Sequence, residues 1–282
     1  MAGYLIAAVI IFLALGLGVR LLERATLYHP WPLEKGEIGY LTERLGPGDE
    51  TFEEVSFPTE DGETVTGWLG TPPEPRATLL WFHGNAGNVL HRWDDFGCFV
   101  RNERYRVLIV DYRGFGRSTG SPDEAGLYLD ARAALDFLEA RGVPSPEVFL
   151  LGRSIGGAVA IELATARPVK GLILESTFSS AKDMAREMIP FFPVTWFTRS
   201  RFPSRERIAT LSVPILMFHG RNDRIVPFRH AGRLVDAAVK TKVELVPVDS
   251  GHNDLSSRMG DAYFRRVAEF VAGVDRSPSE PR

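Results

Sequence analysis

The sequence is poor in the residues that would tie it to disulfides, metals or nucleic acids. Its 282 residues include a single cysteine, Cys98, which excludes an intramolecular disulfide and is typical of a small buried apolar residue. No group of residues has metal-ligand spacing, and no internal repeat is visible. Its 33 basic and 36 acidic side chains leave a net charge of −3, which gives no electrostatic reason to bind nucleic acid. We therefore expect no metal, no organic cofactor and no nucleic-acid partner.

Charged residues are also missing from Ala2–Val19, and Leu21-Leu22 extends the apolar run to the length of a membrane-spanning helix. A cleaved secretory signal is disfavoured because no basic residue precedes the run and no clean small-x-small site follows it. The sequence predicts an uncleaved single-pass transmembrane signal anchor over 1–24 and a connecting segment over 25–49. Arg20 and Arg24 favour a cytoplasmic domain, but Glu23 offsets them, so the side of the membrane stays open.

The most informative motif is Gly152-Arg153-Ser154-Ile155-Gly156, a Gly-x-Ser-x-Gly sequence. A short apolar run, Val148–Leu151, leads into it, and a helix-compatible segment, Ala158–Arg167, follows. This order of strand, sharp turn and helix is typical of a nucleophile elbow, which exposes the serine hydroxyl. The glycines let strand and helix approach closely. Ser154 is the predicted nucleophile.

Serine catalysis needs a histidine base and a carboxylate that orients it. In proteins with a nucleophile elbow of this kind, the acid and then the histidine follow the serine along the chain, each in a loop after a strand. Asp223 follows the apolar run Pro214–Phe218, and His252 follows Val243–Val248. The sequence therefore predicts a triad of Ser154, Asp223 and His252.

Rival residues suit the roles less well. Asp249 and Asp254 lie too close to His252 in sequence to reach its far ring nitrogen. Of the six histidines, only His252 has the expected order and context. The others belong to the segment after the apolar run, to strand ends or to surface helices: His29, His83, His219, His91 and His230.

An acyl-transfer enzyme also needs two N–H groups for the tetrahedral oxyanion, and losing one donor costs roughly 10²–10³ in rate. One comes from the residue after the nucleophile, here Ile155. The other comes from the loop after an early central strand, and that strand is Thr78–Phe82. Gly84, Ala86 and Gly87 make the following loop small, and Asn85 N–H is the predicted second donor.

The chain carries several motifs in order: His83–Asn88, Asp111–Ser118, Gly152–Gly157, Glu175–Phe178 and the loops of Asp223 and Gly251-His252. Together they resemble the membrane-anchored, Bem-type group of α/β hydrolases, which is often grouped with serine aminopeptidases. The resemblance extends from about residue 50 to residue 272 and includes the N-terminal anchor. It implies an α/β-hydrolase fold and the same Ser154, Asp223 and His252 as triad, but it says little about substrate.

The pattern of alternating strands and helices predicts one α/β domain over 50–272, a mostly parallel eight-stranded sheet with helices on both faces. A hairpin turning at Asp61-Gly62 opens it, and a polar tail over 273–282 is predicted to be disordered. The expected later strands are Leu79–Phe82, Val107–Asp111, Val148–Leu151, Gly171–Glu175, Ile215–Phe218 and Val243–Val248. The expected helices are Asp94–Asn102, Glu124–Arg141, Ala158–Arg167, Arg229–Val239 and Asp261–Ala272.

A cap insertion is predicted at about 178–210, where this fold often carries a lid. Its aromatic and apolar side chains either pack the insertion on the sheet or offer an apolar acyl pocket. They are Met184, Met188, Ile189, Phe191, Phe192, Trp196, Phe197 and Phe202.

The sequence thus predicts a membrane-anchored serine hydrolase that cleaves carboxylic ester or thioester bonds of acyl or lipid-like substrates, either small molecules or lipids. Two other functions stay open. One is a serine aminopeptidase, although the insertion has no acidic cluster to hold a substrate amine. The other is a non-catalytic, membrane-tethered interaction protein on a hydrolase scaffold. The oligomeric state is left open.

Overall fold

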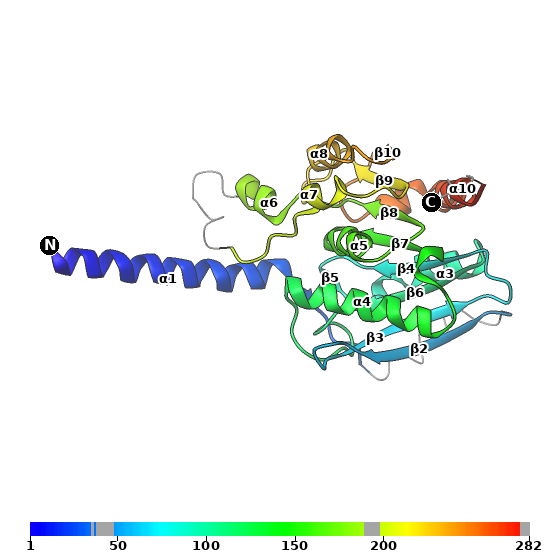
Figure 1. Ribbon diagram of the computed structural model, residues 1–282, viewed down its shortest axis with the longest axis horizontal. Helices are drawn as coiled ribbons and strands as arrows, with labels where there is room; N and C mark the ends of the chain where they lie inside the picture. Colours follow the sequence, from blue (N-terminus) through cyan, green and yellow to red (C-terminus); the bar gives the residue numbers. More distant parts are fainter. Residues whose placement is uncertain (35–36, 38–47, 189–197, 277–282) are drawn as a thin grey trace.

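The computed structural model describes residues 1–34, 37, 48–188 and 198–276, and one eight-stranded sheet organises most of them (Figure 1). The strand order is β10-β9-β8-β7-β4-β6-β3-β2. The first six run parallel, whereas β3 pairs antiparallel with both β6 and β2 at one edge. The strands are β2 (Thr51–Pro58), β3 (Thr64–Thr71), β4 (Ala77–Phe82), β6 (Tyr105–Asp111), β7 (Val148–Arg153), β8 (Gly171–Glu175), β9 (Ile215–Gly220) and β10 (Val243–Val248).

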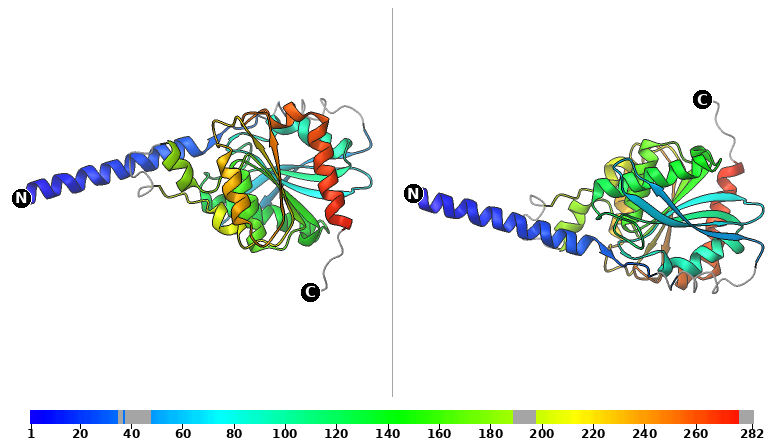
Figure 2. Two further views of the ribbon diagram at one scale, coloured as in Figure 1. Left: turned by 90° about the horizontal axis from the view of Figure 1, so that it is seen from above. Right: turned by 90° about the horizontal axis from the view of Figure 1, so that it is seen from below.

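Helices cover both faces of this sheet because successive strand residues point to opposite sides. Leu80 and Phe82 pack on one face with α4, α5, α7 and α8, while Leu79 and Trp81 pack on the other with α3, α9 and α10 (Figure 2). This architecture confirms the predicted fold class. The helices are α3 (Trp93–Arg101), α4 (Glu124–Ala140), α5 (Ile155–Ala166), α7 (Ser204–Ile208), α8 (Arg229–Ala237), α9 (Leu255–Met259) and α10 (Asp261–Arg276); two 3₁₀ helices are Val89–Arg92 and Ser145–Glu147.

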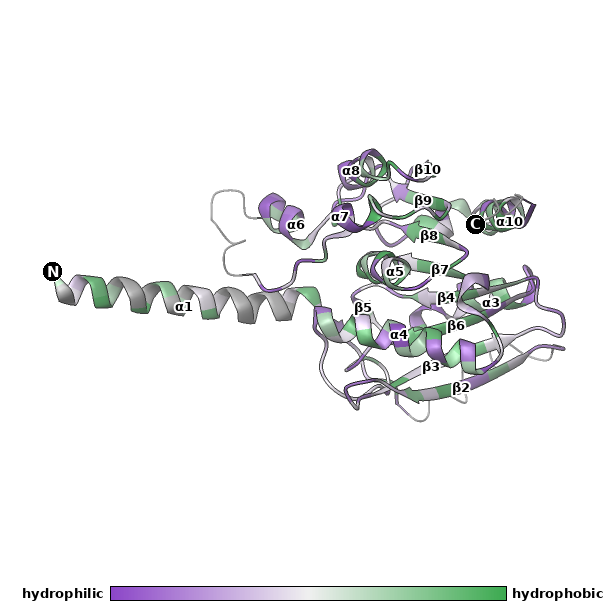
Figure 3. Ribbon diagram, viewed as in Figure 1, coloured by the Kyte–Doolittle hydropathy of each residue, from purple (hydrophilic) through white to green (hydrophobic). Residues whose placement is uncertain are grey.

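The central strands are buried on both faces, which explains their nearly continuous apolar sequences (Figure 3). The opening hairpin turns where expected, with Gly62 at φ +88° and Pro58 opposite Thr64. Several helix ends differ from the sequence expectation by one or two residues, and two differ by three or more. α5 begins at Ile155, directly after the serine, and α10 continues to Arg276 because Val274 packs against the apolar cluster on that face. Residues 277–282 of the predicted tail lie outside the described residues.

The N-terminal segment forms one long helix, α1 (Ala2–Leu27), which projects from the domain (Figure 1). Within the described part of the chain, no helix reaches the combination of length and apolar character that crossing a membrane requires. The transmembrane helix predicted for 1–24 is therefore not supported by the structure.

The segment after α1 is bound to the domain. Tyr28 and Leu33 are buried, and β1 (His29–Pro30) pairs parallel with β5 (Ala86–Gly87) in a separate two-stranded sheet. Residues 35–36 and 38–47 of the predicted connecting segment lie outside the described residues.

The predicted cap contains α6 (Ala181–Met188) and α7. Residues 189–197 lie outside the described residues, and with them Phe191, Phe192, Trp196 and Phe197. Phe202 is fully buried and meets Tyr128 and Phe178 edge to face. The packing of Phe202 therefore anchors the cap insertion on the domain.

Candidate active site

Ser154 lies in a sharply strained turn between β7 and α5. Its backbone dihedrals are φ 54° and ψ −117°, a region that residues with a side chain rarely adopt. The neighbouring glycines make the turn possible, because a Cβ on Gly152 would lie 2.5 Å from the carbonyl oxygen of Gly156 and one on Gly157 would lie 2.5 Å from Thr177 Cβ. The structure therefore has the strand, turn and helix geometry that the motif predicts.

Hydrogen bonds to the neighbouring strand help to fix the backbone of this turn. Ser154 N–H donates to the carbonyl oxygen of Glu175 (2.8 Å), and Thr177 Oγ1 donates to the carbonyl oxygen of Ser154 (2.8 Å). Both partners come from the end of the neighbouring strand β8. Gly157 N–H of α5 also donates to the carbonyl oxygen of Ser154 (3.0 Å), so the sheet and the start of the helix together hold the strained serine.

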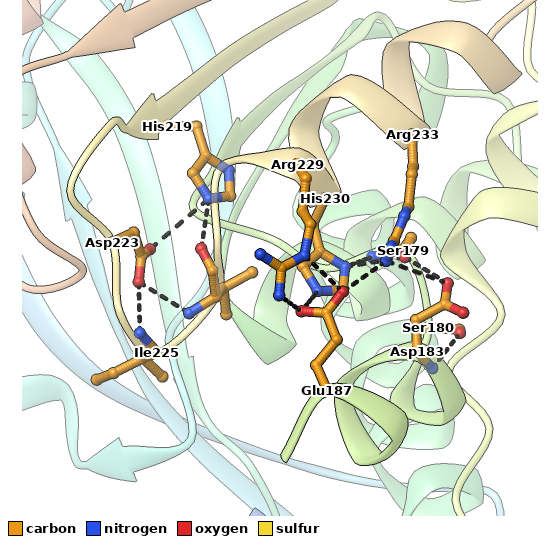
Figure 4. Close-up of polar contacts among 11 residues, drawn as sticks. Ser179, Ser180, Asp183, Glu187, His219, Asp223, Ile225, Arg229, His230 and Arg233 are labelled. Atoms are coloured by element: carbon orange, nitrogen blue, oxygen red, sulfur yellow. Dashed lines mark hydrogen bonds and ion pairs between the residues drawn. The ribbon is translucent and has the colours of Figure 1, made fainter. Parts of the chain in front are cut away.

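Asp223 and His252 lie side by side in the loops after β9 and β10. His252 Nδ1 donates to Asp223 Oδ2 across 2.7 Å, and both side chains are almost completely buried. Asp223 Oδ1 accepts the N–H groups of Ile225 (2.9 Å) and Val226 (2.8 Å), as Figure 4 shows. The carboxylate is therefore fixed by its own loop while its other oxygen orients the imidazole.

The surroundings keep Asp223 ionised. Burial raises the pKa of this carboxyl, but the hydrogen bond from His252 and the two N–H groups outweigh burial, so the pKa lies below its ordinary value. His219 lies behind it, with Nε2 donating to Val226 O (2.8 Å) and 3.7 Å from Asp223 Oδ2. Burial lowers the pKa of His219. This histidine has the structural role that its position before a glycine predicts.

The loop of His252 is attached to the nucleophile turn. Arg153, the residue before Ser154, donates from Nη2 to the carbonyl oxygen of His252 (3.0 Å). Asp254 Oδ1 accepts Gly251 N–H (2.7 Å), which shapes the turn before the histidine. Within the described residues, Ser154 Oγ makes no hydrogen bond to His252. Unliganded active sites commonly have a loose contact of this kind, which tightens when substrate binds.

The predicted oxyanion loop lies against the nucleophile. A Cβ on Gly84 would be 3.7 Å from Ser154 Cβ, so the loop backbone passes directly beside the serine. His83 Nδ1 donates to the carbonyl oxygen of Gly84 (2.6 Å). In a trans peptide the N–H points opposite to the carbonyl, so this bond turns Asn85 N–H away from the His83 ring. The carbonyl of Asn85 in turn accepts His29 N–H of β1 (2.8 Å).

Ile155 provides the other predicted donor. As the first residue of α5 it has an N–H without a partner inside the helix, at the positive end of the helix dipole. The structure thus brings the loop of Asn85 and the start of α5 to the same serine.

A second serine and histidine pair lies under the cap and has a structural role. Ser179 N–H donates to His230 Nδ1 (3.2 Å), and His230 Nε2 donates to Glu187 of α6 (3.2 Å) (Figure 4). Ser179 Oγ donates to Asp183 (2.6 Å), and Ser179 and His230 are fully buried. Substrate has no access to this hydroxyl. The prediction that His230 is a surface residue is wrong, because the network that holds α6 on α8 covers it.

Three residues near the site had no predicted role: His29, Arg153 and His230. Arg153 carried the clearest signal, because it is a charged side chain at the end of an apolar strand. His29 and His230 act through partners distant in sequence, which local patterns do not reveal.

Comparison with known proteins identifies similar chains. Residues 73–206 match the family described as serine aminopeptidase, S33. The protein bem46 of Schizosaccharomyces pombe is 37% identical over 235 residues, which cover 79% of this chain and 78% of the relative. The uncharacterized protein YfhR of Escherichia coli K12 is 32% identical over 237 residues, or 80% of this chain and 82% of the relative.

Solved structures share the fold. The Pyrococcus furiosus esterase Pf2001 superposes with a TM-score of 0.69 at 21% identity and covers 88% of this chain and 98% of its own. An α/β hydrolase from Vibrio vulnificus superposes with a TM-score of 0.72 at 20% identity, covering 88% of this chain and 92% of its own. At these identities the likeness concerns the fold alone.

Proposed function

The chain belongs to the α/β-hydrolase family of bem46, and from this premise we propose that it cleaves carboxylic ester or thioester bonds of acyl or lipid-like substrates. The observation that carries the proposal is the buried Asp223–His252 pair beside a serine held at φ 54°. Strain of this kind costs about 1–3 kcal/mol and persists at sites where it serves a function. The family and the fold support a serine hydrolase, and we propose the ester or thioester substrate in addition.

In the proposed mechanism Ser154 Oγ attacks the acyl carbon while His252 Nε2 takes its proton. Asp223 holds the proton on Nδ1 and stabilises the imidazolium that forms. The N–H groups of Ile155 and Asn85 bind the developing oxyanion. His252 then protonates the leaving alcohol or thiol, and a water activated by the same imidazole releases the acyl group from Ser154. No step needs a metal or an organic cofactor.

A peptidase is the second function, because the matched family is described as a serine aminopeptidase. Removing an N-terminal residue requires a free carboxylate that holds the substrate ammonium group. Glu187 of α6 is already bound by Arg229 and Arg233, at 2.6 and 2.9 Å, and by His230. Its negative charge is therefore neutralised within the protein, which favours the ester substrate over the peptide.

The experiment is covalent labelling with a fluorophosphonate, followed by hydrolysis of p-nitrophenyl acyl esters of increasing chain length. The Ser154→Ala variant should lose both labelling and hydrolysis, while Ser179→Ala, which removes the other serine next to a buried histidine, should keep them. Aminoacyl p-nitroanilides, assayed in parallel, distinguish a peptidase from an esterase. Labelling of the Ser154→Ala variant at the normal rate would refute the assignment of Ser154 as the nucleophile. A wild-type protein that reacts with no probe would point to a non-catalytic protein.

We also propose that α1 attaches the enzyme to a lipid bilayer. Ala2–Val19 contains no charged residue. Leu5, Ile6 and Ile10 of the helix are exposed. Such apolar side chains favour a hydrocarbon environment over water.

A further inference from the structure

Arg153 is a buried cation directly beside the nucleophile. It is the last residue of β7, and only 8% of its surface is exposed. A guanidinium removed from water needs hydrogen-bond acceptors and negative charge nearby, or its burial is strongly unfavourable. Its partners therefore indicate why the fold keeps a charge at this place.

The hydrogen bonds of Arg153 go to the segment that carries the base. Nη2 donates to the carbonyl oxygen of His252 (3.0 Å), 99 residues away in sequence, and to Asn253 Oδ1 (3.3 Å). Asp223 holds the imidazole ring of the same histidine from its Nδ1 side. The backbone and the ring of His252 are thus fixed by two different elements, the end of β7 and the loop after β9.

Two acids interact electrostatically with Arg153, the buried Glu175 and the partly buried Asp95. Glu175, at the end of β8, is held by a hydrogen bond from Tyr263 of α10, and Asp95 of α3 accepts Ser256 Oγ (2.9 Å). Burial raises the pKa of Glu175, and the Arg153 guanidinium opposes that shift more than any other charge. Burial likewise raises the pKa of Asp95, with Arg153 again opposing it.

Arg92 is the second cation of this cluster, and it differs from Arg153 in its contacts. Its Nη1 donates to its neighbour His91 O (3.1 Å), and its Nε has no partner within the described residues. Burial and the charge of Arg153 lower the pKa of Arg92 to about 10. Arg92 therefore shares the electrostatic environment of Arg153 but, in the described part of the chain, makes no hydrogen bond to the His252 segment, which makes it a matched control.

We propose that Arg153 is a positioning residue, which sets the distance between His252 and Ser154 by tying the backbone of the base to the turn of the nucleophile. The inference rests on the proposed serine hydrolase. A base displaced by about 1 Å from its productive position loses on the order of 10²-fold in rate. The turn that holds Ser154 in its strained conformation therefore also positions the base, His252, through the side chain of Arg153.

The test compares Arg153→Gln, Arg153→Lys and Arg92→Gln in the full chain. The second-order rate constant of fluorophosphonate labelling should fall by about 10²-fold in Arg153→Gln. Lysine keeps the charge and a donor nitrogen but not the planar guanidinium, so Arg153→Lys should recover part of that rate. Arg92→Gln should stay within about threefold of the wild-type rate. Thermal unfolding of all three separates positioning from a general loss of stability.

A second readout follows the His252 imidazole itself. The proton that Nδ1 shares with Asp223 should give a low-field NMR signal in the wild type, because a short charged hydrogen bond deshields it. The signal should persist in Arg92→Gln and broaden or disappear in Arg153→Gln.

The outcomes distinguish the two proposals. Equal labelling rates and an unchanged NMR signal in Arg153→Gln would overturn the positioning role and leave the hydrolase intact. Equal losses in Arg153→Gln and Arg92→Gln would assign the effect to the shared charge cluster and also overturn it. A wild type that shows no labelling, and no change of the NMR signal in Arg153→Gln, would remove both proposals.

Discussion

Three carboxylates lie near His252 in sequence or in space, and their surroundings differ. Asp249 is largely exposed and faces Arg221 at 3.6 Å, while Asp254 accepts Gly251 N–H and pairs with Arg258. Asp223 alone of the three bonds the imidazole in the described structure. The role of the acid is therefore decided by geometry, even though Asp223 is the furthest of the three along the chain.

Replacing Asp223 with asparagine should lower kcat by on the order of 10⁴, because an amide no longer holds the imidazole in the required tautomer. Ester hydrolysis at saturating substrate measures the effect. The matched control is Asp249→Asn, which removes an exposed carboxylate from the same region and should keep the wild-type rate. A near-normal rate in Asp223→Asn would assign the role of acid to another carboxylate.

The positions of Ser154, Asp223 and His252 could be predicted because each follows an apolar strand, and parallel strands bring their carboxyl ends to one edge of the sheet. Their roles as a triad stay predictions until activity is measured. The charge of Arg153 at the end of an apolar strand was visible in the sequence, but its partners were not, because they lie 99 and 100 residues away. His230 was misplaced for a similar reason: a polar residue in a helical pattern indicates a surface, unless another helix covers it.

At the scale of elements, polar contacts join α6 to α8, while Ala181 and Met184 of α6 pack against the core. None of its side chains is fully buried, and Glu187 joins it to Arg229 and Arg233 of α8. Burial raises the pKa of Glu187, but the hydrogen bonds from the two arginines and the electrostatic interaction with His230 lower it to about 2, from an ordinary value of 4.5. The ionised carboxylate therefore stabilises the folded state. That contribution is complete above pH 4.5 and is lost as the pH falls toward 2.

The variant Glu187→Gln should lower the Tm at pH 7 by roughly 2–4 °C, equivalent to about 1 kcal/mol. The difference from wild type should shrink as the pH is lowered from 4.5 toward 2, since the wild-type carboxyl then becomes neutral as well. Thermal unfolding across this pH range measures it. Glu206→Gln, an exposed acid on α7, is the control and should leave the Tm unchanged. A difference in Tm between Glu187→Gln and the wild type that does not change with pH would exclude the carboxylate charge as its source.

The order of strands and helices was largely predictable, since each expected strand lies within an observed one. The residues at which the helices begin and end were less predictable. α5 starts at Ile155 because the turn passes directly into the helix, and α10 extends to Arg276 because Val274 finds apolar partners. Such ends depend on tertiary packing, which a local pattern of residues does not contain.

At the scale of the whole molecule, α1 and the loops of the site lie at the same end of the sheet. β1 follows α1 directly and pairs with β5, which comes just after the carboxyl end of β4 (Figures 1 and 2). If α1 binds a bilayer, as we propose, the site therefore faces the lipid from which acyl substrates come.

Flotation with liposomes tests the attachment. The full chain should float with the vesicles at high salt, because apolar burial is insensitive to salt, and detergent should release it. The variant carrying both Leu5→Lys and Ile10→Lys places charges on exposed positions of α1 and should stay at the bottom of the gradient. Wild-type protein that remains unbound to vesicles would contradict the attachment.

The pairing of β1 with β5 has a practical consequence for work with shortened chains. Asn85 O is satisfied by His29 N–H, and Trp31 N–H donates to Gly87 O at 3.3 Å. A recombinant fragment that starts beyond Leu33 would leave these carbonyls open to water and free the backbone next to Ser154 to shift. Deleting the apolar helix while retaining the chain from Tyr28 onward would preserve that backbone, so the choice of first residue decides whether a soluble fragment reports the true catalytic rate.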